Sequence, residues 1–163
     1  MRSEYLWSII LFFPVLLIQT TILPIIAIHG IVPDLILILL VFYSMRLGQL
    51  YGTVLGFLYG FLLDMITGSL LGSTMISLTI AGFIAGYFSN ENKRDYYFKN
   101  YIFVLIVFMC SSINSVLNSF FSSADLNTNL IHLLLNQGIL PALYTSLISF
   151  LVVFFYPKRS FES

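Results

Sequence analysis

The sequence predicts an all-α integral membrane protein, a six-transmembrane-helix bundle with both termini in the cytoplasm, and three observations lead to this. Of the 163 residues, 59% are hydrophobic and only 9% are charged, whereas a soluble domain usually carries about 25% charged residues. The apolar residues form long runs that turn residues and charges separate. All lysines and arginines fall on one side of a six-span layout. A soluble globular domain is therefore excluded.

Six apolar segments are expected to cross the membrane, since a spanning helix needs about 20 apolar residues. They cover residues 5–28, 33–45, 47–66, 71–88, 100–121 and 130–156. The first is longer than a signal-peptide core and lacks a small-x-small cleavage pattern, so we expect it to be retained. The second is short and is expected inside the bundle or starting in the outer headgroup region. The loops are too short for another domain, so residues 1–163 form a single transmembrane domain.

The basic residues predict the orientation of the bundle. They are Arg2, Arg46, Lys93, Arg94, Lys99, Lys158 and Arg159. Because lysine and arginine mark cytoplasmic loops, the positions of these residues place both termini in the cytoplasm. The loop that contains Lys93, Arg94 and Lys99 is explained as a topology determinant; a site for anionic lipids or a docking patch is the alternative.

A row of glycines at a spacing of four runs through the third segment. It consists of Gly48, Gly52, Gly56 and Gly60, followed at the same spacing by Asp64, Gly68 and Gly72. Small residues in such a row let another helix approach closely in a membrane. Each step of four drifts by about 40° around a helix, so we expect the inner and outer glycines to have different neighbours. Gly68 and Gly72 are expected to shape the following turn, and the third segment to be the central helix.

Two carboxylates touch the apolar segments near the predicted outer boundary. Asp34 follows Pro33 at the start of the second segment, and Asp64 lies near the end of the third. Ionisable residues inside a membrane are functional candidates. The structural alternative is that Asp34 faces a helix N-terminus and that Asp64 accepts hydrogen bonds from the turn at 67–69 or from another helix. Partner binding, and transport or catalysis, stay open; a partner would have to supply the cation.

Polar residues also form a stripe along the fifth segment. They are Ser111, Ser112, Asn114, Ser115, Asn118, Ser119 and Ser122. Asn114 and Asn118 share one helix face, which we expect to point into the bundle together with Gln137 of the sixth segment. Such groups form hydrogen bonds between helices, and a ligand cavity is the alternative.

No catalytic residue, metal site or cofactor is expected. The sequence contains no nucleophile elbow, phosphate-binding loop or zinc signature. His29, His132 and Asp125 are expected at the same face as the two acids, but no pair has a spacing of three or four residues. Nothing in these patterns favours an enzyme.

The central block of the sequence resembles the bacterial rod shape-determining family MreD. The resemblance rests on PDL at 33–35 and on GTVLGFLYGFLLDMITGSLLG at 52–72. The matching residues are Pro33, Asp34, Gly56, Phe57, Gly60, Asp64, Gly68 and Gly72. The family is similar in architecture to the S components of energy-coupling-factor vitamin transporters, which implies an S-component-like bundle.

The resemblance implies a non-enzymatic scaffold of the cell-elongation complex in the bacterial plasma membrane, which maintains cell shape by organising peptidoglycan synthesis. The implied partners are the bitopic protein MreC, RodA, a class B penicillin-binding protein, MreB and the lipid bilayer. The glycine row and the two acids then become candidate partner contacts, and neither nucleic acid nor a small-molecule substrate is expected. The alternative is a substrate-binding S component, whose outward-opening pocket would have Asn114 and Asn118 in its wall.

Overall fold

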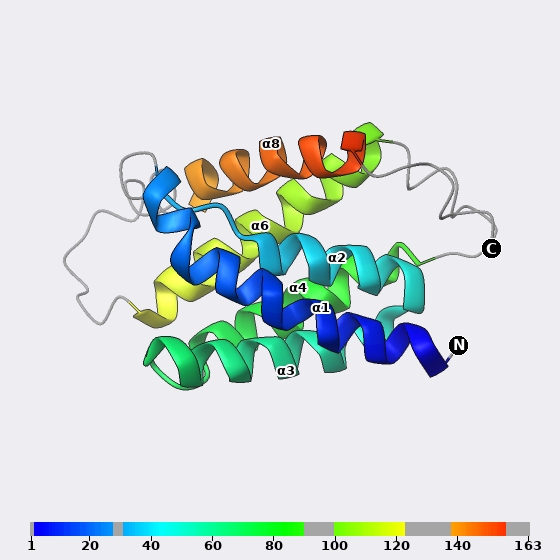
Figure 1. Ribbon diagram of the computed structural model, residues 1–163, viewed down its shortest axis with the longest axis horizontal. Coiled ribbons are helices and arrows are strands. Elements are labelled where there is room, and N and C mark those ends of the chain that lie inside the picture. Colours follow the sequence, from blue (N-terminus) through cyan, green and yellow to red (C-terminus); the bar gives the residue numbers. More distant parts are fainter. Residues whose placement is uncertain (1, 28–30, 90–99, 123–137, 156–163) are drawn as a thin grey trace.

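The computed structural model describes residues 2–27, 31–89, 100–122 and 138–155, which form six α-helices and one 3-10 turn (Figure 1). The elements are α1 (Arg2–Thr21), η1 (Leu23–Ile26), α2 (Leu35–Leu47), α3 (Gln49–Thr67), α4 (Ser73–Tyr87), α6 (Asn100–Ser122) and α8 (Leu140–Phe155). Successive helices alternate in direction, so α1 begins and α8 ends at the same end of the bundle (Figure 1). The described residues contain no β-strand, as predicted.

Two of the described helices are long and apolar enough to cross a membrane, over Gln49–Thr67 and Tyr101–Phe121. The other apolar helices are shorter. The 13 residues of α2 correspond to about 20 Å, less than the roughly 30 Å of the hydrocarbon core. Each helix overlaps a predicted span, while residues 130–137 of the last span lie outside the described residues. A crossing by all six helices stays a prediction.

Local sequence explains where the helices begin and end. Pro24 lies in the first turn of η1, where the missing backbone N–H costs no hydrogen bond. The side chain of Asp34 caps the N-terminus of α2. Gly68 ends α3 with φ of 67°, and Gly72 precedes α4 with φ of 106°. These left-handed conformations favour glycine, so the two glycines set the turn between α3 and α4.

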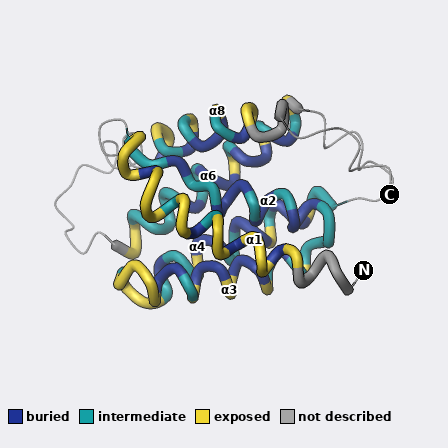
Figure 2. Tube along the Cα trace, in the orientation of Figure 1, coloured by how far each residue is buried: buried dark blue, intermediate teal, exposed yellow. Residues whose placement is uncertain are grey.

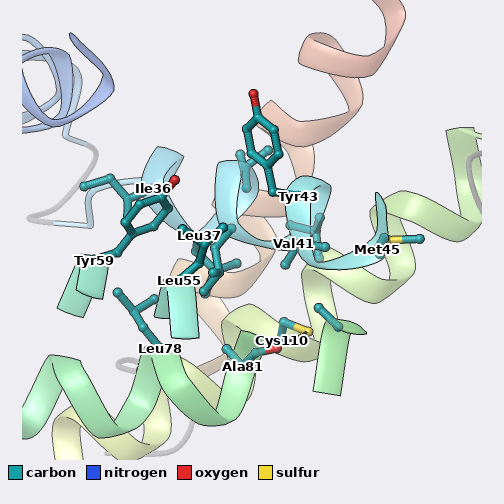
Figure 3. Close-up of a cluster of buried hydrophobic side chains, with 14 of the residues drawn as sticks. Ile36, Leu37, Val41, Tyr43, Met45, Leu55, Tyr59, Leu78, Ala81 and Cys110 are labelled. Atoms are coloured by element: carbon teal, nitrogen blue, oxygen red, sulfur yellow. Dashed lines mark hydrogen bonds between the residues drawn. The ribbon is translucent and has the colours of Figure 1, made fainter. Parts of the chain in front are cut away.

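The most central helix is α2, which contacts α1, α3, α4, α6 and α8. It is apolar on nearly every side, and a helix of this kind belongs in the interior. Leu37, Leu55, Leu78 and Cys110 show how α2, α3, α4 and α6 meet in one cluster (Figure 3). The tube in Figure 2 is accordingly darkest along α2 and along the inner sides of its neighbours. The prediction that the third segment is central is therefore wrong.

The glycine row of α3 packs against α4 backbone to backbone. A Cβ atom added to Gly52, Gly56 or Gly60 would collide with the backbone of Gly82, Leu78 or Met75, respectively. All three glycines thus share α4 as a neighbour, and the inner Gly52 also lies against Ser44 of α2, so inner and outer glycines differ only in this additional contact. The physical reason is that a helix inclined to α3 can follow a drifting four-residue row along its whole length.

Replacing Gly56 by alanine is expected to destabilise the chain by about 1–3 kcal/mol, the usual cost of overpacking. The added methyl group would meet the carbonyl of Leu78, and α4 could not stay in place. Helix propensity alone gives the opposite sign, because alanine is favoured over glycine by about 1 kcal/mol.

Unfolding in mixed detergent micelles measures this difference in stability. Val54→Ala, on the exposed face of the same helix, serves as the matched control and should change stability by less than about 0.5 kcal/mol. A Gly56→Ala protein as stable as the wild type would contradict the packing of α3 on α4.

Candidate functional site

The carboxylate of Asp64, near the end of α3, binds the start of α4. Its Oδ2 accepts hydrogen bonds from the backbone N–H groups of Gly72 at 2.8 Å and Met75 at 3.2 Å. Its Oδ1 accepts from the Ser69 hydroxyl at 2.8 Å and from the N–H of Thr74 at 3.3 Å. Asp64 therefore caps α4 from the preceding helix, at a helix end that favours negative charge.

Asp64 is buried and its acceptor positions are filled, so it cannot also bind a ligand or a partner. The residue is 1% exposed, and each of its two oxygens already accepts two hydrogen bonds. A carboxylate offers about four acceptor positions in all. The structural interpretation of Asp64, hydrogen bonding to the following turn and the next helix, is the one that the geometry supports.

Asp34 is the N-cap residue of α2. Its Oδ1 accepts hydrogen bonds from the N–H of Leu37 at 3.0 Å and from the Gln19 amide at 3.2 Å. Its Oδ2 accepts from the Asn114 amide at 3.1 Å. The first turn of α2 is thereby satisfied, and its capping carboxylate is tied to α1 and α6.

Two further hydrogen bonds complete this polar junction. The Gln19 carbonyl accepts from the N–H of Ile36 at 2.9 Å, and the Thr145 hydroxyl accepts from the N–H of Asp34 at 3.1 Å. We call Gln19, Asp34, Asn114 and Thr145 the Asp34 junction. It joins α1, α2, α6 and α8 at the end of the bundle where α2 begins, although its members are up to 126 residues apart in sequence, Gln19 to Thr145.

A cavity of about 230 Å³ lies beside the junction. It is lined by Gln19, Val32, Pro33, Asp34, Asn114, Ser115, Asn118, Ser119, Pro141 and Thr145. Asn114 is 6% exposed, and its carbonyl oxygen is buried without a hydrogen-bond partner. Buried polar atoms rarely lack a partner, so this oxygen is an exception within the polar network beside the cavity.

The residues predicted from the sequence lie in separate parts of the structure. Gly52, Gly56 and Gly60 lie in the contact with α4, while Gly48, Gly68 and Gly72 lie at helix ends. Pro33, Asp34, Asn114 and Asn118 line the cavity, and Asp64 belongs to the turn after α3. Gln137, His29, His132 and Asp125 lie outside the described residues.

Sequence reasoning missed Gln19 and Thr145. Gln19 is a polar residue near the end of an apolar helix, and that isolation was a usable signal. Thr145 carried none, because threonine in a membrane helix usually bonds its own backbone, as Thr145 also does to Pro141 at 2.8 Å. Within the part of the chain that the structure describes, no hydrogen bond joins Asp34 to Asp64.

The described residues bring together no group of three or more His, Cys, Asp or Glu side chains that could hold a metal ion. The site can accept hydrogen bonds through a carboxylate and amides at a partly open cavity. Such a site can bind and position a group.

The described residues are helical, and two of their helices are long and apolar enough to cross a membrane, which is consistent with the class of α-helical membrane proteins. The family described as rod shape-determining protein MreD matches residues 1–159, and the chain belongs to this family. It is a family of bacterial membrane proteins with a role in determining rod shape. Comparisons with curated proteins and with solved structures gave no match.

Asp64→Ala is expected to cost at least about 2 kcal/mol of stability, because it leaves the backbone N–H groups of Gly72, Thr74 and Met75 at the start of α4 without this acceptor. Ser69→Ala removes one of the four hydrogen bonds and should cost only about 1 kcal/mol. Unfolding of both variants in mixed micelles makes the comparison. Equal losses would show that Asp64 does not organise the start of α4.

Proposed function

We propose that the chain is a non-enzymatic scaffold of the bacterial cell-elongation complex, which helps to maintain rod shape by organising peptidoglycan synthesis. The single observation that carries this proposal is the family match over residues 1–159. In this proposal the chain crosses the plasma membrane six times with both termini in the cytoplasm.

The hydrogen bonds that the polar side chains form within the chain support a structural role. Asp64 is saturated by its own chain, and the Asp34 junction fixes four helices at one end of the bundle. The glycine row holds α3 and α4 in direct backbone contact. A rigid apolar bundle of this kind can present fixed surfaces to other membrane proteins.

The positions of the described basic residues support the proposed orientation. Arg2 begins α1 and Arg46 lies in the last turn of α2, and both belong to the end of the bundle opposite Asp34 (Figure 1). The positive-inside rule assigns that end to the cytoplasm, so the Asp34 end faces outward. The remaining lysines and arginines lie outside the described residues.

The proposed partners are MreC, with RodA, a class B penicillin-binding protein and MreB in a larger complex. Gly52, Gly56 and Gly60 are covered by α4, so this part of the predicted partner interface is already filled within the chain. The opposite face of α3 is apolar and open, with Phe57 46% and Phe61 41% exposed. Phe57 also belongs to the block that resembles the family, so we propose this face for a helix of MreC.

A second candidate function, a substrate-binding S component of a vitamin transporter, is favoured by the polar lining of the cavity, although its volume of about 230 Å³ would have to increase to hold a vitamin. Asn114 and Asn118 lie in its wall, where that function needs them. A purified chain that retains a vitamin through chromatography would support this alternative.

Depletion of the protein in its rod-shaped host is expected to give rounded cells, and wild-type expression should restore the rods. Cell width and the pattern of fluorescent D-amino acid incorporation measure the effect. Cells that stay rod-shaped but need a supplied vitamin would replace the scaffold with the transporter subunit.

The double variant Phe57→Ala, Phe61→Ala is expected to reduce co-purification with MreC at least tenfold while the chain still folds, since both side chains are half exposed. Leu143→Ala, Leu147→Ala on the exposed face of α8 is the matched control and should retain MreC. Undiminished binding by the α3 variant would exclude this face as the contact.

A further inference from the structure

The cavity beside Asp34 is lined by side chains that accept hydrogen bonds. Its volume of about 230 Å³ lies below the roughly 300–1,000 Å³ of pockets for drug-sized ligands. Since one water takes up about 30 Å³ in the liquid, the space suits several waters or one small organic group. Residues of α1, α6 and α8 and of the segment before α2 line this partly open cavity, so its walls are held by the Asp34 junction.

The hydrogen bonds at Asp34 leave one acceptor position open. Oδ1 accepts from Leu37 and Gln19, whereas Oδ2 accepts from Asn114 alone. A carboxylate offers about four acceptor positions, so one on Oδ2 is unused. Unlike Asp64, Asp34 can therefore take a further N–H donor.

Asn114 adds a second unsatisfied acceptor. Its NH₂ group must face the carboxylate, because a flipped amide would set oxygen against oxygen. The amide orientation is thus fixed, and the carbonyl oxygen is left buried without a donor. Asn114 and Asp34 both line the cavity, but the Asn114 carbonyl oxygen is covered, so a ligand in the cavity would reach it only after a shift of the amide.

The charge of Asp34 also has no partner in the described part of the chain. Arg2 and Arg46 are the basic residues that the structure describes, and both lie at the opposite end of the bundle. Asp34 is partly buried among apolar helices, where a carboxylate is stabilised by a cation or by further donors. A bound cation with N–H groups would satisfy both the charge and the open acceptor position on Oδ2.

We propose that this cavity binds a primary ammonium group on a ligand of about the size of ethanolamine, with Asp34 Oδ2 as the anionic contact. An ammonium group brings three N–H donors, which suit the open position on Asp34 Oδ2 and the hydroxyl oxygens of Ser115 and Ser119 in the lining. A quaternary ammonium group would need an aromatic cage, and the cavity has no aromatic side chain among its lining residues. A bare metal ion needs oxygen ligands on all sides at about 2.0–2.6 Å, which so wide a space does not provide.

This ligand site goes beyond the scaffold function and does not depend on it. The same ammonium chemistry occurs in free small amines and in the ethanolamine headgroup of a membrane lipid. The two sources are distinguished by experiment.

Fluorine NMR of the purified full chain in detergent micelles tests the site with 2-fluoroethylammonium as the probe. The uncharged 2-fluoroethanol, which has nearly the same shape, is the control ligand. Saturable binding of the ammonium probe and none of the alcohol is expected. Equal behaviour of the two probes would mean a water-filled cavity and would overturn the proposal.

Asp34→Asn is expected to weaken binding of the probe at least tenfold. Asparagine is as good an N-cap as aspartate and keeps an acceptor for Leu37, so the change removes the charge with little effect on α2. Unchanged affinity in a folded Asp34→Asn protein would overturn the assignment of Asp34.

Ser119→Leu gives an independent test that keeps the charge of Asp34 and fills the cavity from α6. It should abolish binding, whereas Ser112→Leu, on the same helix but outside the cavity lining, should retain it. These two α6 variants test whether the cavity binds the probe even if Asp34→Asn does not fold. Binding that survives Ser119→Leu would place the probe elsewhere.

The source of the ammonium group follows from the same probe in lipid nanodiscs. If a lipid headgroup is the ligand, adding phosphatidylethanolamine to phosphatidylglycerol discs lowers the apparent probe affinity, and the lipid stays bound in native mass spectrometry. If a free amine is the ligand, both discs give the same affinity. Either result supports the ammonium site, and no saturable probe binding in either disc overturns it.

Discussion

The backbone contact between α3 and α4 is the constraint on which the rest of the bundle depends. Gly52, Gly56 and Gly60 offer no side chains, so the carbonyls and Cα atoms of α4 lie directly on them. In lipid, where burial of apolar surface gives helices little reason to associate, such contact is what dispersion and close packing can provide. Helix α2 packs on the pair formed by α3 and α4, and α1, α6 and α8 also contact α2.

The two interior acids then have unequal roles at one end of the bundle. Asp64 is fully used in fixing the turn that lets α4 return along α3. Asp34 fixes the start of α2 and gathers three other helices, yet it keeps an open acceptor beside a cavity. The position of an acid among apolar helices does not by itself separate a structural role from a binding role. The count of donors around each carboxylate does separate them.

Much of this could be predicted from the sequence, because hydropathy, glycine spacing and capping residues are local signals. The all-helical class, the role of Asp34 as a helix cap and the turn at Gly68 and Gly72 follow from them. The central position of α2 could not be predicted from the sequence, because it depends on which neighbouring helices cover each of its faces. Nor could the Asp34 junction, because Gln19 and Thr145 acquire their roles only when α1 and α8 are brought to the start of α2.

The contact between the glycine row and α4 within one chain can be measured directly by solid-state NMR in lipid. Labels at the Cα atoms of glycine and the carbonyl carbons of leucine should give a short-range correlation between Gly56 and Leu78, whose atoms lie in contact. In a sample that mixes glycine-labelled with leucine-labelled chains, the account predicts that this signal disappears. A signal that persists in the mixed sample would show that the glycine row binds a second molecule, which would contradict the account.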